Sequence, residues 1–300
     1  SLVLMVLGAP TAVFGFQTTD LIPNGNGTYS GWSSNDLNAA TYTDVEEGAG
    51  CVSGAFNDYW ERITSGNNIR QSVTLPVASI PDGTTITGVT IRACNRGIGG
   101  VGTFWLFARI AGTDYSNNTS ITVPGLAGSP NDTTRSISSL SILKNAGTTV
   151  EVGAQKNNSL DVQIGTLSAV ISYQATPTLS VTNSPVTYSG SPQAATVQAN
   201  SDVPAANTIP PGTVNDIKYD GSSTVPTNAG TYAVTADFTP TNPSDYASLD
   251  DAPAGNFVID PADQTITFGP NPGPVTYTLN GTFAVSATAT SGLTVAFSST

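Results

Sequence analysis

The chain has no histidine and few basic residues: its 300 residues include 9 Lys and Arg against 21 Asp and Glu, a formal net charge of −12. The absence of histidine excludes Ser-His-Asp and Cys-His catalytic units, and zinc or haem sites that histidine ligates. The scarcity of basic residues argues against a nucleic-acid partner, because affinity for phosphates comes from clustered lysines and arginines. We therefore expect a protein that is not an enzyme and binds no nucleic acid.

Charged residues are also scarce, at 10% of the chain against about 25% in typical soluble domains. Short β-branched and aromatic runs between turn residues predict an all-β fold. Within 102–110, Phe104 and Leu106 alternate with Trp105 and Phe107, so this strand carries aromatic rings on both faces and is expected to be central or partly covered. The strands expected in the first half of the chain are 40–46, 69–75, 85–94, 102–110, 119–123, 133–138, 148–155 and 160–173.

The segment 1–16 carries no charged side chain. It fits the tail of a secretion signal, whereas Pro10 and its short length argue against a membrane span. If the segment is retained, its apolar run predicts a strand buried on both faces, which could pair with a neighbouring subunit. The expected donor strand consists of Leu2, Val3, Leu4, Met5, Val6 and Leu7.

The region 17–174 resembles the jelly-roll β-sandwich modules of bacterial secreted and surface proteins. The likeness rests on the turn Pro81-Asp82-Gly83 with the strand after it, and on the closing runs 150–155 and 170–173. Such sandwiches serve carbohydrate binding, assembly and plain structure alike, so the resemblance implies a fold and no ligand.

The region 175–261 resembles the MBG repeat, an immunoglobulin-like β-sandwich found in tandem in large bacterial adhesins. The residues that carry the likeness are the Tyr-x-Gly run at 188–190, the Tyr-Asp-Gly run at 219–221 and the segment 226–236. Pro-Val-Thr-Tyr stands at 185–188 and again at 274–277, an offset of 89 residues that indicates a tandem array. We therefore expect 262–300 to begin a further repeat, which is too short to bury a core alone and which continues past Thr300 or pairs with another chain.

Cys51 and Cys94 are 43 residues apart. In an exported protein they predict a disulfide, and the alternative is two buried free thiols.

Acidic side chains are the candidate metal ligands. Asp44, Glu46 and Glu47 could bind Ca²⁺, which prefers oxygen ligands, although hydration alone would also satisfy them.

Aromatic residues are the candidate carbohydrate platform. Trp32, Tyr59 and Trp60, together with Trp105, could stack on sugars, or they could belong to the core.

These observations predict a non-enzymatic extracellular structural protein: a subunit of a bacterial surface filament or cell-surface stalk, a homopolymer assembled by β-strand pairing. The alternative is a carbohydrate-binding cell-surface adhesin that binds surface glycans. A third class, the accessory part of an enzyme whose catalytic domain lies beyond Thr300, stays open.

Overall fold

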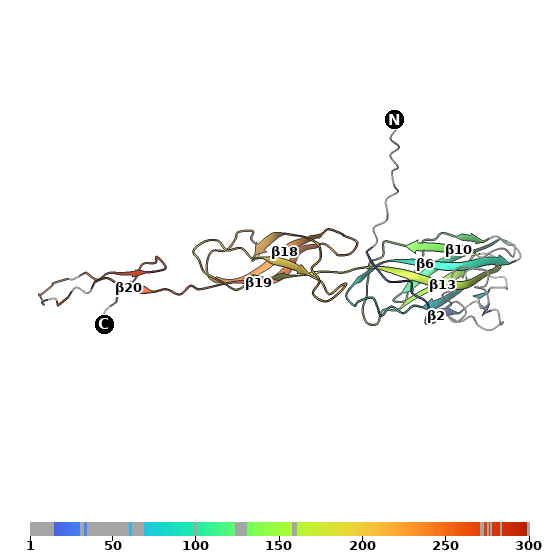
Figure 1. Ribbon diagram of the computed structural model, residues 1–300, viewed down its shortest axis with the longest axis horizontal. Coiled ribbons are helices and arrows are strands. Elements are labelled where there is room, and N and C mark those ends of the chain that lie inside the picture. The colour runs from blue at the N-terminus through green and yellow to red at the C-terminus, as the bar shows by residue number, and fades with distance from the viewer. Residues whose placement is uncertain are drawn as a thin grey trace, which may run out of the picture. The chain divides into compact units, whose positions relative to one another are not determined.

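The computed structural model describes residues 15–30, 33–34, 60–61, 69–98, 101–123, 131–157, 161–270, 273–274, 276, 278–282 and 284–298. All regular elements in these ranges are strands (Figure 1). They form several antiparallel sheets, which are consistent with β-sandwich domains and confirm the all-β fold. The chain divides into two compact units, one made of 1–178, 199–215 and 237–250 and the other of 179–198, 216–236 and 251–300.

Two sheets make up most of the first unit. The first sheet contains, in order, β10 (Asn131–Ile137), β6 (Thr85–Ile98), β13 (Asp161–Gln174), β4 (Trp60–Glu61) and β3 (Ser33–Ser34), with β1 (Phe16–Gln17) on β13 and β11 (Ile142–Leu143) on β6. The second sheet contains β2 (Gly25–Ser30), β5 (Arg70–Thr74), β12 (Val150–Lys156), β7 (Gly102–Ile110) and β8 (Thr113–Tyr115), with β9 (Ile121–Val123) on β7.

The core of this unit follows the period of two that a strand imposes, because successive side chains point to opposite faces. On β7, Phe104, Leu106 and Ala108 are buried, and they belong to one apolar cluster with Val152 of β12 and Ile91 of β6. β7 pairs with β12 on one side and with β8 and β9 on the other. The expectation that residues 102–110 form a central strand is therefore confirmed.

Most of the expected strands in this region are present. β5, β6, β7, β9, β10, β12 and β13 lie within a few residues of their expected ranges, whereas the expected strand 40–46 falls outside the described residues. The short edge strand β2 was not expected, because its Gly-Asn-Gly start is typical of a turn. Its place in the sheet depends on side-chain contacts with β5 and β12 that the local sequence does not indicate.

The turn predicted at Pro81-Asp82-Gly83 is confirmed. Gly83 has a φ of +83°, which glycine adopts without steric cost. The Thr84 hydroxyl donates a hydrogen bond of 2.8 Å to the Pro81 carbonyl. Lys144, on the neighbouring loop, forms an ion pair of 2.7 Å with Asp82.

A separate four-stranded sheet follows in sequence. Its order is β15 (Val186–Thr187), β19 (Leu249–Asp260), β18 (Gly230–Pro240) and β17 (Gly212–Tyr219), with β15 parallel to β19. β14 (Thr178–Val181) and β16 (Val197–Asn200) pair with each other. Val234, Phe257 and Ile259 are buried, and buried Tyr219 accepts a hydrogen bond of 2.7 Å from the Ala195 amide.

The last described strands are β20 (Ile266–Phe268) and β21 (Ala287–Ala289), which form an antiparallel hairpin. Within the described part of the chain, each of the two pairs only with the other.

Candidate functional site

The residues expected to carry function lie largely outside the described ranges. This holds for the donor strand Leu2 to Leu7, for Trp32 and Tyr59, for the acidic group Asp44, Glu46 and Glu47, and for Cys51. The backbone of Trp60 lies in β4, paired with Ile164 of β13, but its side chain is not described. Cys94 is buried and disulfide-bonded, and its pairing with Cys51 stays a prediction.

The clearest apolar surface lies on the C-terminal hairpin. In β20, Ile266 and Phe268 occupy alternate positions opposite Ala289 and Ala287 of β21, and Phe268 is 70% exposed. Small alanine side chains opposite the two large ones leave the apolar face uncovered. The other large apolar side chains exposed in this segment are Leu279, Val285, Leu293 and Phe297.

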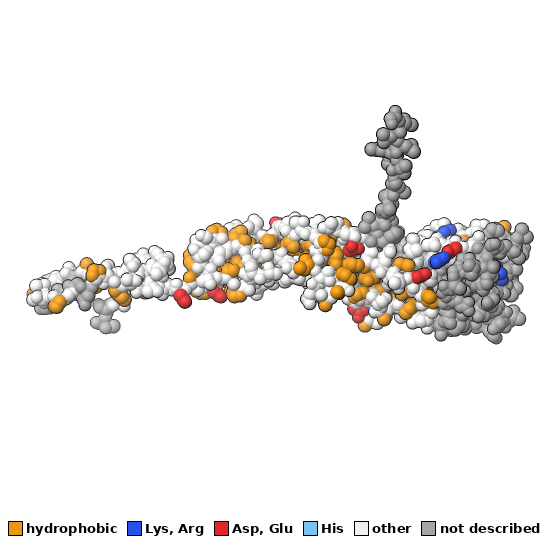
Figure 2. All heavy atoms as spheres, viewed as in Figure 1, with side chains coloured by type: hydrophobic (Ala, Val, Ile, Leu, Met, Phe, Trp, Pro, Cys, Tyr) orange, Lys and Arg blue, Asp and Glu red, His pale blue; other side chains and the backbone are white. Residues whose placement is uncertain are grey.

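No charged residue occurs in 264–300. In Figure 2 the segment that carries β20 in Figure 1 is accordingly white and orange, with no acidic or basic side chain. An uncharged hairpin with an uncovered apolar face, whose strands pair only with each other among the described residues, is a surface on which another strand can pair. We call residues 264–298 the apolar hairpin segment.

A second cluster occupies the outer face of the second sheet, opposite the core. Register places Gln155 of β12 beside Arg70 and Trp105, and Glu151 beside Arg109. Charged, amide and aromatic side chains from three strands therefore share one face. The alternation of polar residues along β5, β7 and β12 could have indicated this face from the sequence, whereas the neighbours across strands could not be read from it.

Glu151 attaches the edge strand β2 to this face. Its carboxylate accepts hydrogen bonds from the Thr28 amide at 2.7 Å, the Thr28 hydroxyl at 2.6 Å and the Ser72 hydroxyl at 2.7 Å. Three donors from two strands converge on one buried carboxylate, so Glu151 acts as a crosslink between β2, β5 and β12.

Asp114 of β8 holds two arginines on the same face. Arg70 forms an ion pair with Asp114, and Arg109 donates to the other carboxylate oxygen at 2.7 Å. The Tyr29 hydroxyl donates to Asp114 at 2.6 Å, and the Tyr29 ring lies 5.3 Å from the Arg70 guanidinium. Burial raises the pKa of Asp114, but hydrogen bonds from Tyr29 and Arg109 and the two positive charges outweigh it, so the net effect is a lowered pKa.

A cavity of about 410 Å³ lies along β6, β10 and β13, and a smaller one of about 120 Å³ adjoins the Arg70 cluster. The smaller cavity is lined by the aromatic residues Trp105, Phe107 and Tyr115 and by the polar residues Arg70, Asp114, Ser116, Asn118 and Gln155. The indole Nε1 of Trp105 is buried, and no acceptor for it is found among the described residues. The hollow is small and combines aromatic and polar lining residues.

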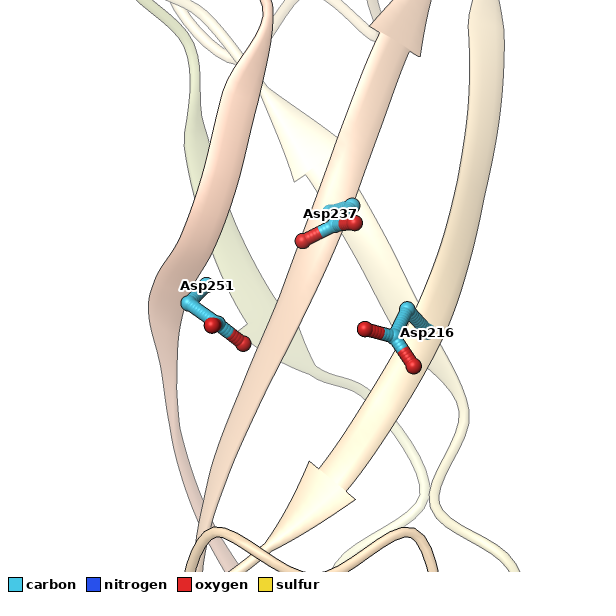
Figure 3. Close-up of side chains that lie close together, drawn as sticks. All are labelled: Asp216, Asp237 and Asp251. Carbon is cyan, nitrogen blue, oxygen red and sulfur yellow. The ribbon is translucent and has the colours of Figure 1, made fainter.

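Acidic residues also gather on the four-stranded sheet. Asp216, Asp237 and Asp251 lie on the neighbouring strands β17, β18 and β19, and one carboxylate oxygen of each lies within 4.8 Å of the others (Figure 3). The Lys218 ammonium is 2.9 Å from Asp216 and 2.5 Å from Asp251, and these hydrogen bonds raise the pKa of Lys218, Asp251 contributing most. The chain's own lysine occupies the position of a cation, and we infer no metal site from this cluster.

Among the described residues there is no helix with the length and hydropathy needed to span a membrane.

Comparison with known proteins identifies one part of the chain. Residues 175–263 match the MBG domain family, so this region is an MBG domain, as the resemblance of 175–261 predicted. No curated protein shows a significant match to the sequence.

Comparison with solved structures gives only remote likenesses. An arabinose-bound α-L-arabinofuranosidase is 12% identical, with 51% of this chain and 26% of that chain covered and a TM-score of 0.32. The CBM36-1 domain of a xylanase from the hindgut metagenome of Trinervitermes trinervoides is 17% identical, with 52% of this chain and 96% of that chain covered and a TM-score of 0.25. The glycoside hydrolase domain of Endo-D from Streptococcus pneumoniae R6 is 14% identical, covering 79% of this chain and 36% of that chain, with a TM-score of 0.21. At these TM-scores the likenesses carry no argument about function.

Proposed function

We propose that the chain is a non-enzymatic extracellular structural protein, a subunit of a bacterial surface filament or stalk whose copies assemble by β-strand pairing. In this proposal a jelly-roll sandwich is followed by immunoglobulin-like units, of which the MBG domain is one. The observation that carries it is the uncovered apolar face of the hairpin segment, with Phe268 70% exposed and Leu279 81% exposed.

The partner strand in this proposal is the apolar run Leu2 to Leu7 of a neighbouring copy. Both segments lack charged residues, so no ion has to be desolvated when they meet. The alternating side chains of an all-apolar strand can cover Ile266 and Phe268 on one face while its backbone pairs with the edge of β20 or β21. Chains that donate a strand at one end and accept one at the other form an open, head-to-tail assembly.

The free energy of one strand-pairing contact is a balance between apolar burial and the cost of association. Burial of six partly exposed apolar side chains is worth on the order of 5–10 kcal/mol. The loss of translational and rotational freedom on association costs about 4–15 kcal/mol. Apolar burial alone thus leaves one contact marginal, and backbone hydrogen bonds along the added strand supply the remaining stabilisation.

The test uses the full chain, observed by negative-stain electron microscopy and sedimentation velocity, with N-terminal sequencing of the same sample. We expect filaments or oligomers of chains that retain residues 1–15, and monomers after deletion of 1–15. Phe268→Asp should also give monomers, because it places a charge on the contact face.

The matched control is Ile209→Asp. Ile209 is 62% exposed but lies outside the hairpin segment, so this variant should assemble like the unmodified chain. Assembly that survives deletion of 1–15, or an unmodified chain that remains monomeric, would overturn the proposal.

A further inference from the structure

We propose that the 120 Å³ cavity beside Trp105 binds one neutral sugar residue of a glycan. The site shares Trp105 with the expected carbohydrate platform but involves neither Trp32, Tyr59 nor Trp60, and it does not depend on strand pairing. Its walls come from β5, β7, β8, β12 and the loop after β8, which place aromatic and polar groups around one hollow.

The aromatic wall suits a pyranose ring. Sugars present apolar C–H faces that pack on aromatic rings, and hydroxyl groups at the ring edge that need hydrogen-bond partners. Trp105 is only partly buried and offers the larger ring, whereas Phe107 is buried beneath Arg70. The Trp105 Nε1 is buried, so a sugar meets the partly exposed remainder of the indole ring and not this donor.

The polar wall is held in place before any ligand arrives. Arg70 donates to Gln155 Oε1 at 2.5 Å and is ion-paired to Asp114, and its guanidinium lies 5.3 Å from the Tyr29 ring and 5.4 Å from the Phe107 ring. Side chains that are already fixed lose little conformational entropy when a ligand binds. A hydroxyl group both donates and accepts, so it can pair with the Asp114 carboxylate and the Asn118 amide together.

The loop that brings Asn118 to the cavity is itself ordered by local hydrogen bonds. Ser116 donates to Asn118 Oδ1 at 2.8 Å, and the Thr119 amide donates to Asn117 Oδ1 at 3.0 Å. Asn118 has a φ of +55°, a left-handed conformation that asparagine tolerates better than most residues. Its exposed amide therefore stands at the rim in a defined position.

The charge balance favours a neutral ligand. Two arginines, Arg70 and Arg109, face two carboxylates, Asp114 and Glu151, within one network. Because these charges compensate one another, the described surroundings of the cavity offer no excess positive charge for a sialic acid or a phosphate.

The size of the cavity limits what it holds. Sites for drug-sized ligands measure roughly 300–1,000 Å³. A volume of about 120 Å³ accommodates at most one sugar ring, and part of that ring stays outside the cavity. We therefore expect a Kd in the millimolar range for one site, with higher apparent affinity when several copies bind one glycan surface.

The test is saturation-transfer-difference NMR on the full chain, with methyl glucoside, galactoside, mannoside and xyloside as neutral probes and N-acetylneuraminic acid as the anionic comparison. We expect millimolar binding of at least one neutral probe. Trp105→Ala should weaken it about tenfold or more, since stacking supplies most of the contact.

Asn118→Gly provides a second variant if Trp105→Ala does not fold, because glycine keeps the left-handed backbone and removes only the amide side chain. It should weaken binding several-fold. Trp60→Ala and Phe268→Asp should leave binding unchanged, and the second of these separates the sugar site from assembly.

Three results would overturn the proposal. In the first, none of the neutral probes binds, even at concentrations well above millimolar. In the second, the anionic probe binds more tightly than the neutral probes. In the third, neither Trp105→Ala nor Asn118→Gly changes the binding. Loss of binding in Trp60→Ala alone would place the sugar site at Trp60 instead.

Discussion

The Ser72 hydroxyl on β5 donates a hydrogen bond of 2.7 Å to the Glu151 carboxylate on β12, and both side chains are buried on the outer face of the second sheet. Thr28 of β2 donates two further hydrogen bonds to the same carboxylate. One acidic side chain thus fastens an edge strand to the two strands beside it.

Glu151→Ala should therefore loosen β2. Loss of the carboxylate leaves the Ser72 and Thr28 donors without their acceptor, and we expect a loss of about 2–3 kcal/mol in the free energy of unfolding. Chemical denaturation measures that loss, and hydrogen–deuterium exchange should show faster exchange of residues 25–30 than in the unmodified chain.

Asp132→Asn is the control for this prediction. Asp132 is also ion-paired, with Arg92, but that pair is largely exposed and should contribute less than about 1 kcal/mol. Unchanged exchange of β2 in Glu151→Ala would show that the backbone pairing with β5 holds the strand by itself.

The second prediction concerns acid stability. Asp114 has a lowered pKa in the folded protein, so folding favours its carboxylate form. Its contribution to stability is present above the unfolded pKa of about 3.9 and is lost as the pH falls through the lower folded value. The pKa of Asp132 is also lowered, mainly by its hydrogen bond with Arg92, so Asp132 affects stability in the same direction.

We expect the thermal midpoint of the first unit to fall as the pH decreases below about 4. The fall should be smaller in Asp114→Asn, which is less stable at neutral pH but has no carboxylate to protonate. Asp263→Asn, at an exposed position, is the matched substitution and should follow the unmodified chain. The same acid dependence in Asp114→Asn and in the unmodified chain would refute this role.

The third prediction concerns close packing at Gly153 of β12. A Cβ atom there would lie 2.1 Å from the Gln71 carbonyl oxygen and 2.8 Å from the Phe107 ring, so backbone and ring would both have to move. Gly153→Ala should cost about 1–3 kcal/mol or more. Differential scanning calorimetry would measure the loss.

Gly147→Ala is the matched glycine substitution. The nearest atom to a Cβ at Gly147 is the Asn145 Oδ1, 3.9 Å away, so there is space for the methyl group. We expect a neutral effect or a gain of up to about 1 kcal/mol from the restricted unfolded chain. Equal stability of the two variants would contradict the packing argument.

The fourth prediction concerns the disulfide of Cys94. If its partner is Cys51, the bond closes a 43-residue loop, and Cys94→Ser should cost about 3–4 kcal/mol. Peptide mapping without reduction should recover a peptide that joins the two cysteines. A map that shows Cys94 bound to a second chain would exclude the predicted pairing and indicate a covalent dimer.

The sequence alone determined the fold class, most strands of the first unit and the MBG region, because alternation of side chains and turn residues are local signals. Residues 102–110 could be identified as a central strand since both alternating sets contain aromatic side chains. The short length of 262–300 likewise predicted a segment that does not bury a core alone, and the exposed Phe268 agrees with this.

Only the tertiary structure decided which residues meet across strands. Arg70, Asp114 and Gln155 are far apart in sequence, and the register of β5, β12, β7 and β8 brings them to one cavity beside Trp105. Asp216, Asp237 and Asp251 are gathered in the same way by three strands of another sheet. Strand pairing joins distant segments through backbone hydrogen bonds that carry no residue-specific signal, which is why composition and spacing predicted the sheets but not the sites on them.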